Sequence, residues 1–362
     1  MRELLDQLID LLGSGPVALA RVVEATGAGP TPLGAAMIVT DDGDVLGSLS
    51  GGCVEAAVVE SARQVIATGI ASAERFGPQD DVFAVGLPCG GEVEIRVERV
   101  DATRLPLLRA LRADVAANTP VALASVLDGD GAWALLHDGD QRPWRGVDRD
   151  ARALLRAGRS GMVGSDDDRP DSTATCPAAA RPRTFVQVFA AAPRMIVAGA
   201  SDFVRALSET GRQLGYRVTV VDAREVFATP ARFPAAHEVV VAWPHRYLEA
   251  ELAAGRLDRR AVVCVLTHDP KFDVPTLAAA LTADLAFVGA LGSRRAHADR
   301  LGRLRAAGVA DDALRRLHSP LGLDLNAHTP DETAISIAAQ ILAVRDGGSA
   351  RPLADMDGPL HR

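Results

Sequence analysis

The chain has 362 residues, a formal net charge of −8 at pH 7 and 48% hydrophobic residues. This length predicts two domains with substantial cores, and the acidic balance argues against nucleic acid as the main partner. No apolar run is long enough for a membrane span, and the acidic, amphipathic N-terminus is unlike a signal peptide. Four cysteines without a CxxC pair indicate neither a zinc site nor a disulfide framework, which favours a reducing cytoplasm.

The stretch GSLSGGCVE, residues 47–55, joins a short predicted strand to an amphipathic helix. Gly51, Gly52 and Cys53 therefore stand at a helix start, where free N–H groups and the helix dipole favour an anion. Helix starts also favour the thiolate form of a cysteine, which makes Cys53 a candidate nucleophile or ligand. Glu55 either satisfies the dipole or acts on a bound ligand. A tight turn with a small buried cysteine is the alternative.

A second stretch, GLPCGGEVEIRVE at 86–98, places Cys89 before Gly90 and Gly91. The strand that follows alternates apolar and charged residues, which is typical of a strand with one polar face. Cys53 and Cys89, each beside a glycine pair, are candidates for one shared site. Each cysteine alone is also compatible with a structural role.

Residues 1–191 are predicted to form an N-terminal α+β domain with an internal strand–strand–helix duplication. PVALARVV at 16–23 matches PVALASVL at 120–127, and AAMIVTDDGD at 35–44 matches WALLHDGD at 133–140. A predicted helix follows each pair of strands. Chance similarity between apolar strands is the alternative.

The second copy of the duplication, 101–191, lacks both cysteine-glycine motifs, so the first copy, 1–100, is expected to carry the chemistry. The second copy has a predicted helix at 147–161 and a strand at 185–190. Its polar stretch 164–183, rich in Asp, Pro and Ala, is typical of a surface loop.

Residues 192–346 alternate apolar strands with helices, which predicts a Rossmann-like, doubly wound parallel sheet. The first strand leads into a turn at Gly199, and Asp222 stands 23 residues later, near the spacing of an acidic ribose ligand. Ser201 and Val204 replace small residues of the GxGxxG fingerprint. Ser201 can still donate to a phosphate, whereas Val204 is expected to hold the helix further from the sheet. A C-terminal tail follows from residue 347 to 362.

Polar residues also follow the later strands of this sheet, at the end where ligands of such sheets bind. They are Thr267, His268 and Asp269 after one strand, and Gly292, Ser293, Arg294 and Arg295 after the next. The second set opens a helix and can hold phosphate. The alternatives are a capping or core role for the histidine and a solvated helix face for the two arginines.

Taken in order, these motifs resemble the XdhC/CoxI family. GAGPTPLGAAMIVTDDG, GSLSGGCVE and LPCGGEVEIRVE are similar to its N-terminal stretches, whereas THDPKFD, FVGALGSRR and GLDLNAHTPDETAISIAAQ are similar to its Rossmann domain. The resemblance covers roughly 1–100 and 190–345. The family usually has Gly-x-Gly in the first turn, and this chain departs from that pattern at Ser201.

Members of that family are accessory factors for molybdenum hydroxylases such as xanthine dehydrogenase. They bind the molybdenum cofactor (molybdopterin), protect it during sulfuration and hand it to the apoenzyme. The resemblance implies a cytoplasmic cofactor-binding chaperone, rather than a stand-alone enzyme, with an apo molybdenum hydroxylase as partner. It is compatible with a cysteine desulfurase as a further partner and with a homo-oligomer. In this interpretation Cys53 or Cys89 touches the metal or carries sulfur.

Two other classes of function stay open on the sequence. One is an NAD(P)-dependent oxidoreductase, or a xanthine dehydrogenase-associated subunit, that uses the Rossmann domain with His268 and Asp269 as acid–base groups. The other is a scaffold protein whose Rossmann domain has lost its ligand. The altered glycine turn at Ser201 and Val204 counts against NAD(P).

Overall fold

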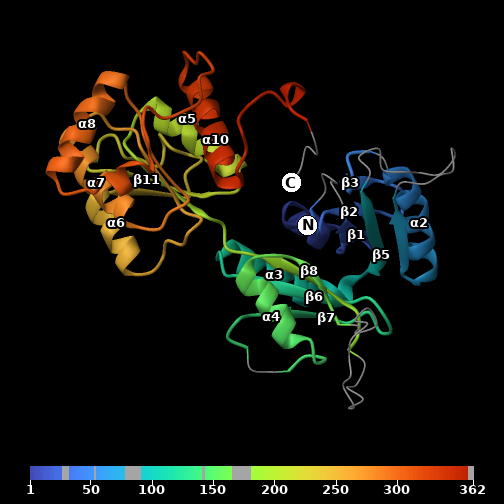
Figure 1. Ribbon diagram of the computed structural model, residues 1–362. Coiled ribbons are helices and arrows are strands. Elements are labelled where there is room, and N and C mark those ends of the chain that lie inside the picture. Colours follow the sequence, from blue (N-terminus) through green and yellow to red (C-terminus); the bar gives the residue numbers. More distant parts are fainter. Residues whose placement is uncertain (27–31, 53, 78–90, 141–142, 165–180, 358–362) are drawn as a thin grey trace, which may run out of the picture. The chain divides into compact units, whose positions relative to one another are not determined.

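The structure is a computed structural model, which describes residues 1–26, 32–52, 54–77, 91–140, 143–164 and 181–357 (Figure 1). Cys53, Cys89, Gly90 and Cys176 lie outside these residues. The chain divides into two compact units, of which unit 1 contains Met1–Ala191 and unit 2 contains Ala192–Met356. None of the helices in the described ranges is long and apolar enough to cross a membrane.

The first half of unit 1 forms an antiparallel sheet, sheet A, with the strand order β3-β2-β1-β5-β4. Its elements are η1 (Arg2–Leu4), α1 (Leu5–Leu11), β1 (Val17–Thr26), β2 (Ala36–Val39), β3 (Val45–Gly47), α2 (Glu55–Thr68), β4 (Ser72–Phe76) and β5 (Glu92–Val100). Helix α2 covers one face of sheet A because Val58, Ala62 and Val65 recur at helical spacing and pack on the strands.

The second half of unit 1 forms sheet B, with the order β7-β6-β9-β8. Its elements are η2 (Ala102–Arg104), α3 (Leu105–Ala116), β6 (Val121–Val126), β7 (Trp133–Leu136), α4 (Asp148–Ala157), β8 (Gly161–Val163) and β9 (Thr184–Phe189). This order repeats β2-β1-β5-β4 strand for strand, which confirms the internal duplication. β4 and β8 were not predicted from the sequence. The predicted helix 147–161 is longer than α4, since Gly158 ends α4 with a φ of 66° and β8 begins at 161.

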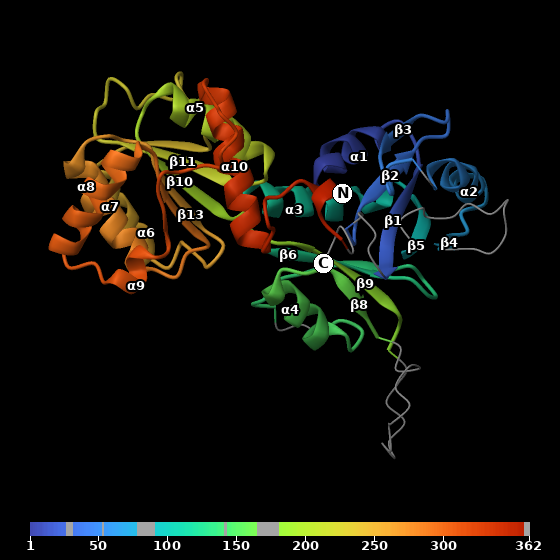
Figure 2. The same cartoon turned by 45° about the horizontal axis from the view of Figure 1, so that its top comes forward.

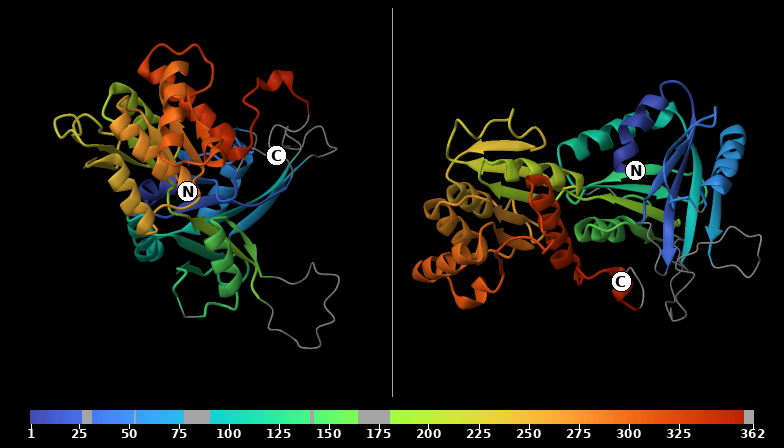
Figure 3. Two further views of the ribbon diagram at one scale, coloured as in Figure 1. Left: turned by 60° about the vertical axis from the view of Figure 1, so that its left-hand side comes forward. Right: turned by 90° about the horizontal axis from the view of Figure 1, so that it is seen from above.

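The two sheets of unit 1 pack on each other through equivalent strands (Figure 3). Alternate residues of β1 and β6 lie in one core between the sheets: Val17 and Leu19 from β1, and Val121 and Leu123 from β6. The intervening alanines of β1 lie under α2, and those of β6 lie in the cluster that contains α4. At the centre, Arg21 Nη2 donates to Ser125 Oγ at 2.9 Å. These two residues occupy the same position in the two copies, so the duplication packs on itself as a dimer would.

Unit 2 contains a parallel sheet with the order β12-β11-β10-β13-β14-β15. Its elements are β10 (Arg194–Ala198), α5 (Asp202–Gln213), β11 (Arg217–Asp222), β12 (Glu238–Val241), α6 (Pro244–Ala253), β13 (Val262–Val265), α7 (Pro270–Thr282), β14 (Phe287–Ala290), α8 (Arg294–Ala306), α9 (Asp311–Leu314), β15 (Leu317–His318), α10 (Pro330–Asp346) and η4 (Leu353–Asp355). The order is that of a doubly wound Rossmann fold, as predicted. Helices α5 and α10 cover one face, and α6, α7 and α8 cover the other (Figure 2).

The close contact between α5 and the sheet occurs at Gly211, two turns after the fingerprint position. Val204 stands where the third glycine of the fingerprint would be, and it is fully buried. A Cβ on Gly211 would lie 2.6 Å from Met195 Sδ and 3.2 Å from Val218 Cγ2. The altered turn therefore does not keep the helix from approaching the strands, because a later glycine allows the approach.

We expect Gly211→Ala to destabilise unit 2 by about 1–3 kcal/mol, because the added methyl group overpacks a closed core. Gly302, in the middle of α8, is the matched control, since no described atom lies within 4 Å of its Cβ position. Gly302→Ala should stabilise the protein by up to about 1 kcal/mol through helix propensity alone. Thermal unfolding followed by circular dichroism measures both, and an equal or higher unfolding temperature for Gly211→Ala would contradict the assignment.

Candidate functional site

One edge of sheet A collects the ends of several strands (Figure 1). β1 and β5 are antiparallel, so Thr26 at the end of β1 lies opposite Glu92 at the start of β5. β4 ends at the same edge, because Phe76 lies opposite Val93. β3 runs in the direction of β1, since both strands are antiparallel to β2, and the chain leaves β3 toward this edge.

Both cysteine motifs are connected to this edge of sheet A. Cys53 lies between β3 and α2, and Cys89 lies in the stretch 78–90 between the end of β4 and the start of β5. Gly91, the second glycine after Cys89, is buried and directly precedes β5, whereas Gly90 lies outside the described residues. That the two motifs contribute to one site stays a prediction.

Glu55 occupies the anion position at the start of α2. Its carboxylate accepts hydrogen bonds of 2.8–3.2 Å from two hydroxyl groups and five backbone N–H groups. The donors are the hydroxyls of Ser48 and Ser50 and the N–H groups of Leu49, Ser50, Gly51, Gly52 and Val54. Burial by itself would raise the pKa of Glu55, but the hydrogen bonds from the serines and Leu49 hold that pKa well below its usual range.

The N–H groups that were expected to be free for a ligand therefore donate to Glu55. Of the two roles predicted for this residue, the structure shows the local one, which is to satisfy the helix start. Gly51 and Gly52 have φ values of 83° and 120°, a region that glycine enters without strain. No described atom lies within 4 Å of a Cβ position on either glycine, so this turn is open on its outer side.

The second copy of the duplication also begins its helix with an acidic residue, without the cysteine. α4 begins at Asp148 as α2 begins at Glu55, and Gly146 takes the place of Cys53. Arg145 and Gly146 have φ values of 53° and 74°, and the Asp148 carboxylate accepts from the N–H group of Trp144. Since the copy without the cysteine retains the acid, we assign Glu55 to holding the turn rather than to chemistry at Cys53.

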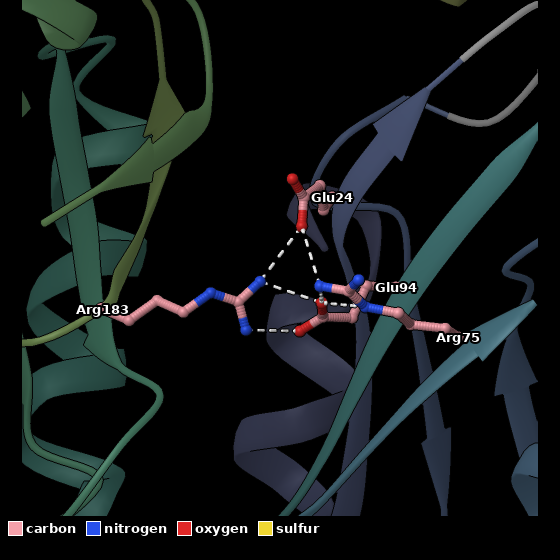
Figure 4. Close-up of polar contacts among 4 residues, drawn as sticks. All are labelled: Glu24, Arg75, Glu94 and Arg183. Carbon is pink, nitrogen blue, oxygen red and sulfur yellow. Dashed lines mark hydrogen bonds and ion pairs between the residues drawn. The ribbon is translucent and has the colours of Figure 1, made fainter. Parts of the chain in front are cut away.

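A cluster of two glutamates and two arginines lies at the same edge of sheet A (Figure 4). Glu94 is 4% exposed, and its carboxylate accepts from Arg183 Nη1 and Nη2 at 2.7 and 2.9 Å and from Arg75 Nε at 3.0 Å. Arg183 Nη2 also donates to Glu24 at 3.1 Å. The hydrogen bonds from Arg183 are the main reason that the pKa of Glu94 is lowered. Arg183 precedes β9, so this cluster joins the two halves of unit 1.

The cluster borders a cavity of about 270 Å³. The cavity is lined by Glu24, Thr26, Arg75, Phe76, Gly77, Glu92, Val93 and Glu94. Acidic side chains outnumber the single arginine among these residues, so the cavity does not attract a phosphate.

This cluster was not predicted from the sequence, because the alternation in β5 indicates a polar face without showing what covers that face. The structure shows that face turned toward the second half of unit 1, where Glu98 accepts from Arg21 Nη2 at 2.5 Å and from Trp133 Nε1 at 3.1 Å. The duplication was the available signal, because a second sheet must cover one face of the first.

In unit 2 the predicted residues lie at the carboxyl edge of the parallel sheet. Asp222 ends β11, but it is 1% exposed and its carboxylate accepts from Arg224 Nε at 2.9 Å and Nη2 at 2.7 Å. This hydrogen-bonded contact also raises the pKa of Arg224. The carboxylate that was expected to bind a ribose is thus occupied by an arginine two residues later. Gly199 and Ser201 lie beside it, in the turn after β10.

The residues after β13 have separate roles. The hydroxyl of Thr267 donates to the buried Asp273, and burial is the main reason that the pKa of Asp273 is raised. Asp269 caps α7 by accepting from the N–H group of Lys271 at 3.1 Å, and it pairs with the Lys271 ammonium at 3.0 Å. His268 is exposed. Across the described ranges, no group of three or more His, Cys, Asp and Glu side chains is placed to hold a metal ion.

The turn after β14 opens α8. Gly292 has a φ of 150°, and Ser293 Oγ caps the helix by accepting from the N–H group of Ala296 at 3.2 Å. Arg294 and Arg295 are exposed on the first turn. Their predicted contact with an anion stays a prediction.

The buried arginine close to this turn is Arg300, which was not predicted from the sequence. It is 5% exposed and donates to Asp273 at 3.0 Å, to the carbonyl of Leu291 at 2.9 Å and to Ser319 at 2.9 Å. Its helical spacing to the buried Leu304 was the available signal. Arg300 therefore ties the turn after β14 to α7.

We expect Glu55→Gln to lower the free energy of unfolding by about 1–3 kcal/mol, because the amide leaves several donors without an anion. Asp148→Asn is the matched control in the second copy, and it should cost less because the aspartate accepts from far fewer donors there. The folded pKa of Glu55 is lowered, so its stabilisation is present above the ordinary glutamate pKa of about 4.3 and is lost as the pH falls toward the folded pKa. Urea unfolding at pH 7 and in acid should show the difference between wild type and Glu55→Gln shrinking in acid.

We expect Arg183→Gln to cost on the order of 2 kcal/mol, because it leaves the buried Glu94 with a weaker partner. The Arg183 side chain is 26% exposed and that of Arg75 is 76% exposed, so Arg75→Gln should cost less than about 1 kcal/mol. Urea unfolding of both variants and of the double variant measures the two contributions. Equal costs would show that the junction between the halves does not depend on Arg183.

Comparison with known proteins adds independent information. The model of the XdhC Rossmann domain matches residues 195–341, and the model of the XdhC and CoxI family matches residues 12–77. The chain is 26% identical to the molybdenum cofactor insertion chaperone PaoD of Escherichia coli K12, over 95% of this chain and 88% of that protein. It is 25% identical to a Bacillus subtilis 168 protein described as a probable subunit of xanthine dehydrogenase, over 90% of this chain and 92% of that protein.

A solved structure shows that the whole fold has a precedent. The crystal structure of a protein described as a xanthine dehydrogenase, from Bacillus halodurans, matches with a TM-score of 0.68 and 24% identity, over 97% of both chains. The two family models fall within different units, one in the first copy of the duplication and one in the Rossmann-like unit. The chain belongs to the XdhC and CoxI family.

Proposed function

We propose that the protein is a maturation factor that binds the molybdenum cofactor in the cytoplasm. It supports sulfuration of the cofactor and its insertion into a xanthine dehydrogenase-type molybdenum hydroxylase. The observation that carries this proposal is the match over nearly the full length to PaoD, whose name describes insertion of this cofactor. The cofactor is cargo here, and the apo hydroxylase is the partner that receives it.

The edge of sheet A at which β4 ends and β5 begins is the part of unit 1 that we propose for this cargo, because β4 and β5 flank the second cysteine motif in the sequence. Soft thiolates suit a molybdenum centre or the carriage of sulfur, and Cys53 and Cys89 are the cysteines in the two motifs. Cys264 differs from them, because it is fully buried in β13 and burial raises its pKa to about 12. It therefore stays a neutral thiol and serves the core of unit 2.

The geometry of unit 2 does not favour the alternative of an NAD(P)-dependent oxidoreductase. The carboxylate of Asp222 is bound by Arg224, so it is not free to accept from a ribose. Asp269 caps α7 and forms an ion pair with Lys271. Its carboxylate is therefore not free to act with His268 as the predicted acid–base pair.

We expect Cys53→Ser to fold and yet fail to deliver active, sulfurated cofactor to the apo hydroxylase, because the substitution removes the soft sulfur donor. Cys89→Ser should give a similar but weaker defect. Cys264→Ala and Cys176→Ser are controls that should retain delivery. Reconstitution of hydroxylase activity measures the effect, with circular dichroism to establish folding.

Full delivery by a protein that carries both Cys53→Ser and Cys89→Ser would remove the thiols from the mechanism. Absence of delivery by the wild-type protein, together with absence of molybdenum in protein purified from cells that make the cofactor, would remove the proposed function itself.

A further inference from the structure

A second cavity, of about 670 Å³, lies wholly within unit 2. It is lined by Gly199, Ala200, Ser201, Arg224, Phe227, Arg232, Leu266, Thr267, His268, Asp269, Lys271 and Phe272. These residues follow β10, β11 and β13, so the cavity sits where the strand order reverses at the carboxyl edge of the sheet. Open α/β sheets bind their ligands at this point.

The lining of this cavity is basic in a chain that is acidic overall. Arg224, Arg232 and Lys271 contribute three cations, and Asp269 is the single acidic side chain among the lining residues. The formal net charge of the chain is −8. A local excess of positive charge in a concave site attracts an anionic ligand.

Arg224 is fixed in place by the residue that was expected to bind a ribose. Asp222 is buried and does not line the cavity, whereas Arg224, which it holds through two side-chain hydrogen bonds, does line it. A guanidinium held rigidly in this way matches the geometry of a phosphate. Asp222 thus contributes to the cavity by holding a cation, Arg224, and not by accepting from a ribose hydroxyl as its position suggested.

Arg232 approaches the same ring as Arg224. The two guanidinium carbons lie 5.6 and 4.9 Å from the centroid of Phe227. No ion pair involves Arg232 within the described part of the chain, and its Nη1 donates to the carbonyl of Phe227 at 3.1 Å. Both arginines line the cavity, so both add positive charge to the surroundings of an anion bound there.

The turn after β10 contributes Gly199, Ala200 and Ser201 to the lining of the cavity. Gly199 has a φ of 127°, and its Cβ would lie 3.3 Å from the backbone of Leu266, so a side chain at this position would be strained. Ser201 Oγ is shielded from solvent and has no hydrogen-bond partner among the described residues. Because Ser201 lines the cavity at the start of the 12-residue helix α5, rotation of its unpaired hydroxyl toward the cavity would provide a donor to a phosphate oxygen.

An aromatic surface adjoins the cavity. Phe272 lines it, and the ring of Trp243 lies 5.0 Å from the ring of Phe272. Phe227 and Trp243 are 43% and 39% exposed. Exposed aromatic rings beside arginine side chains are suited to stacking on a planar heterocycle.

We infer that this cavity binds a phosphate monoester attached to a heteroaromatic ring, as found in a nucleotide or a phosphorylated pterin. Arg224 and Arg232 are the phosphate ligands, and Asp222 is the residue that positions Arg224. The inference concerns unit 2 alone and does not depend on the proposed delivery of cofactor.

The test is isothermal titration of the full-length protein with three probes. These are adenosine monophosphate, adenosine, and a pterin that carries a phosphate monoester. At least one phosphorylated probe should bind wild type, more weakly as salt is raised, and adenosine should bind much more weakly. Arg224→Gln should weaken the phosphorylated probe by about tenfold or more, and Arg232→Gln should weaken it as well.

Arg259→Gln is the matched control, because Arg259 pairs with Asp284 before β13 and β14, at the other edge of the sheet. It should leave binding unchanged. Asp222→Asn should weaken the phosphorylated probe and add nothing to Arg224→Gln, since it acts through Arg224. If Asp222 instead bound a ribose, Asp222→Asn would weaken the binding of adenosine and of adenosine monophosphate to the same extent.

The preferred probe identifies the source of the ligand, nucleotide or pterin. The inference is overturned if neither phosphorylated probe binds wild type at millimolar concentration. It is also overturned if folded Arg224→Gln and Arg232→Gln variants both bind as tightly as wild type. Loss of binding in these variants with normal delivery of cofactor would separate this site from the proposed function.

Discussion

The architecture of unit 1 depends on a fully buried arginine between its two sheets. Arg21 donates to Glu98 and to Ser125, and its guanidinium lies 5.0 Å from the centroid of Trp133 and 5.7 Å from that of Phe185. A buried charge that loses its partner costs several kcal/mol, so the sheets and the ion pair must come together. This constraint fixes sheet B against sheet A, and it turns the charged face of β5 inward. Glu94 on this face then lies within reach of Arg183 from the second half of unit 1.

The regular parts of the fold could be predicted because they depend on local patterns. The apolar runs of unit 2 and the matching of PVALARVV with PVALASVL needed only the order of residues along the chain. The inward face of β5 could not be predicted in the same way. Period-2 alternation says that Glu94 and Val93 lie on opposite faces, but it does not say what covers each face. The residue that neutralises Glu94 is 89 positions away.

The candidate sites show the same division between position and partner. Spacing placed Glu55 at a helix start and Asp222 at a strand end, and both positions are right. Spacing did not reveal that the Glu55 carboxylate turns back onto its own turn, or that Arg224 folds back onto Asp222. Both carboxylates accept hydrogen bonds from donors within seven residues along the chain. A sequence pattern does not show whether a carboxylate binds a ligand or a neighbouring residue. The acidic residue at the start of α4, by contrast, could have been predicted from the duplication.

The turn at Glu55 has a consequence for how an anion would exchange there. Its N–H groups already hold a carboxylate that is tethered a few residues away, so a free anion must displace an internal competitor. Tethering gives such a competitor an effective concentration on the order of millimolar or more. A free anion would therefore bind more weakly here than at an empty helix start, because it competes with this effective concentration of carboxylate. The carboxylate would return as soon as the anion left. A turn of this kind suits transient binding of a ligand, because its backbone N–H groups donate to the Glu55 carboxylate again when the ligand leaves.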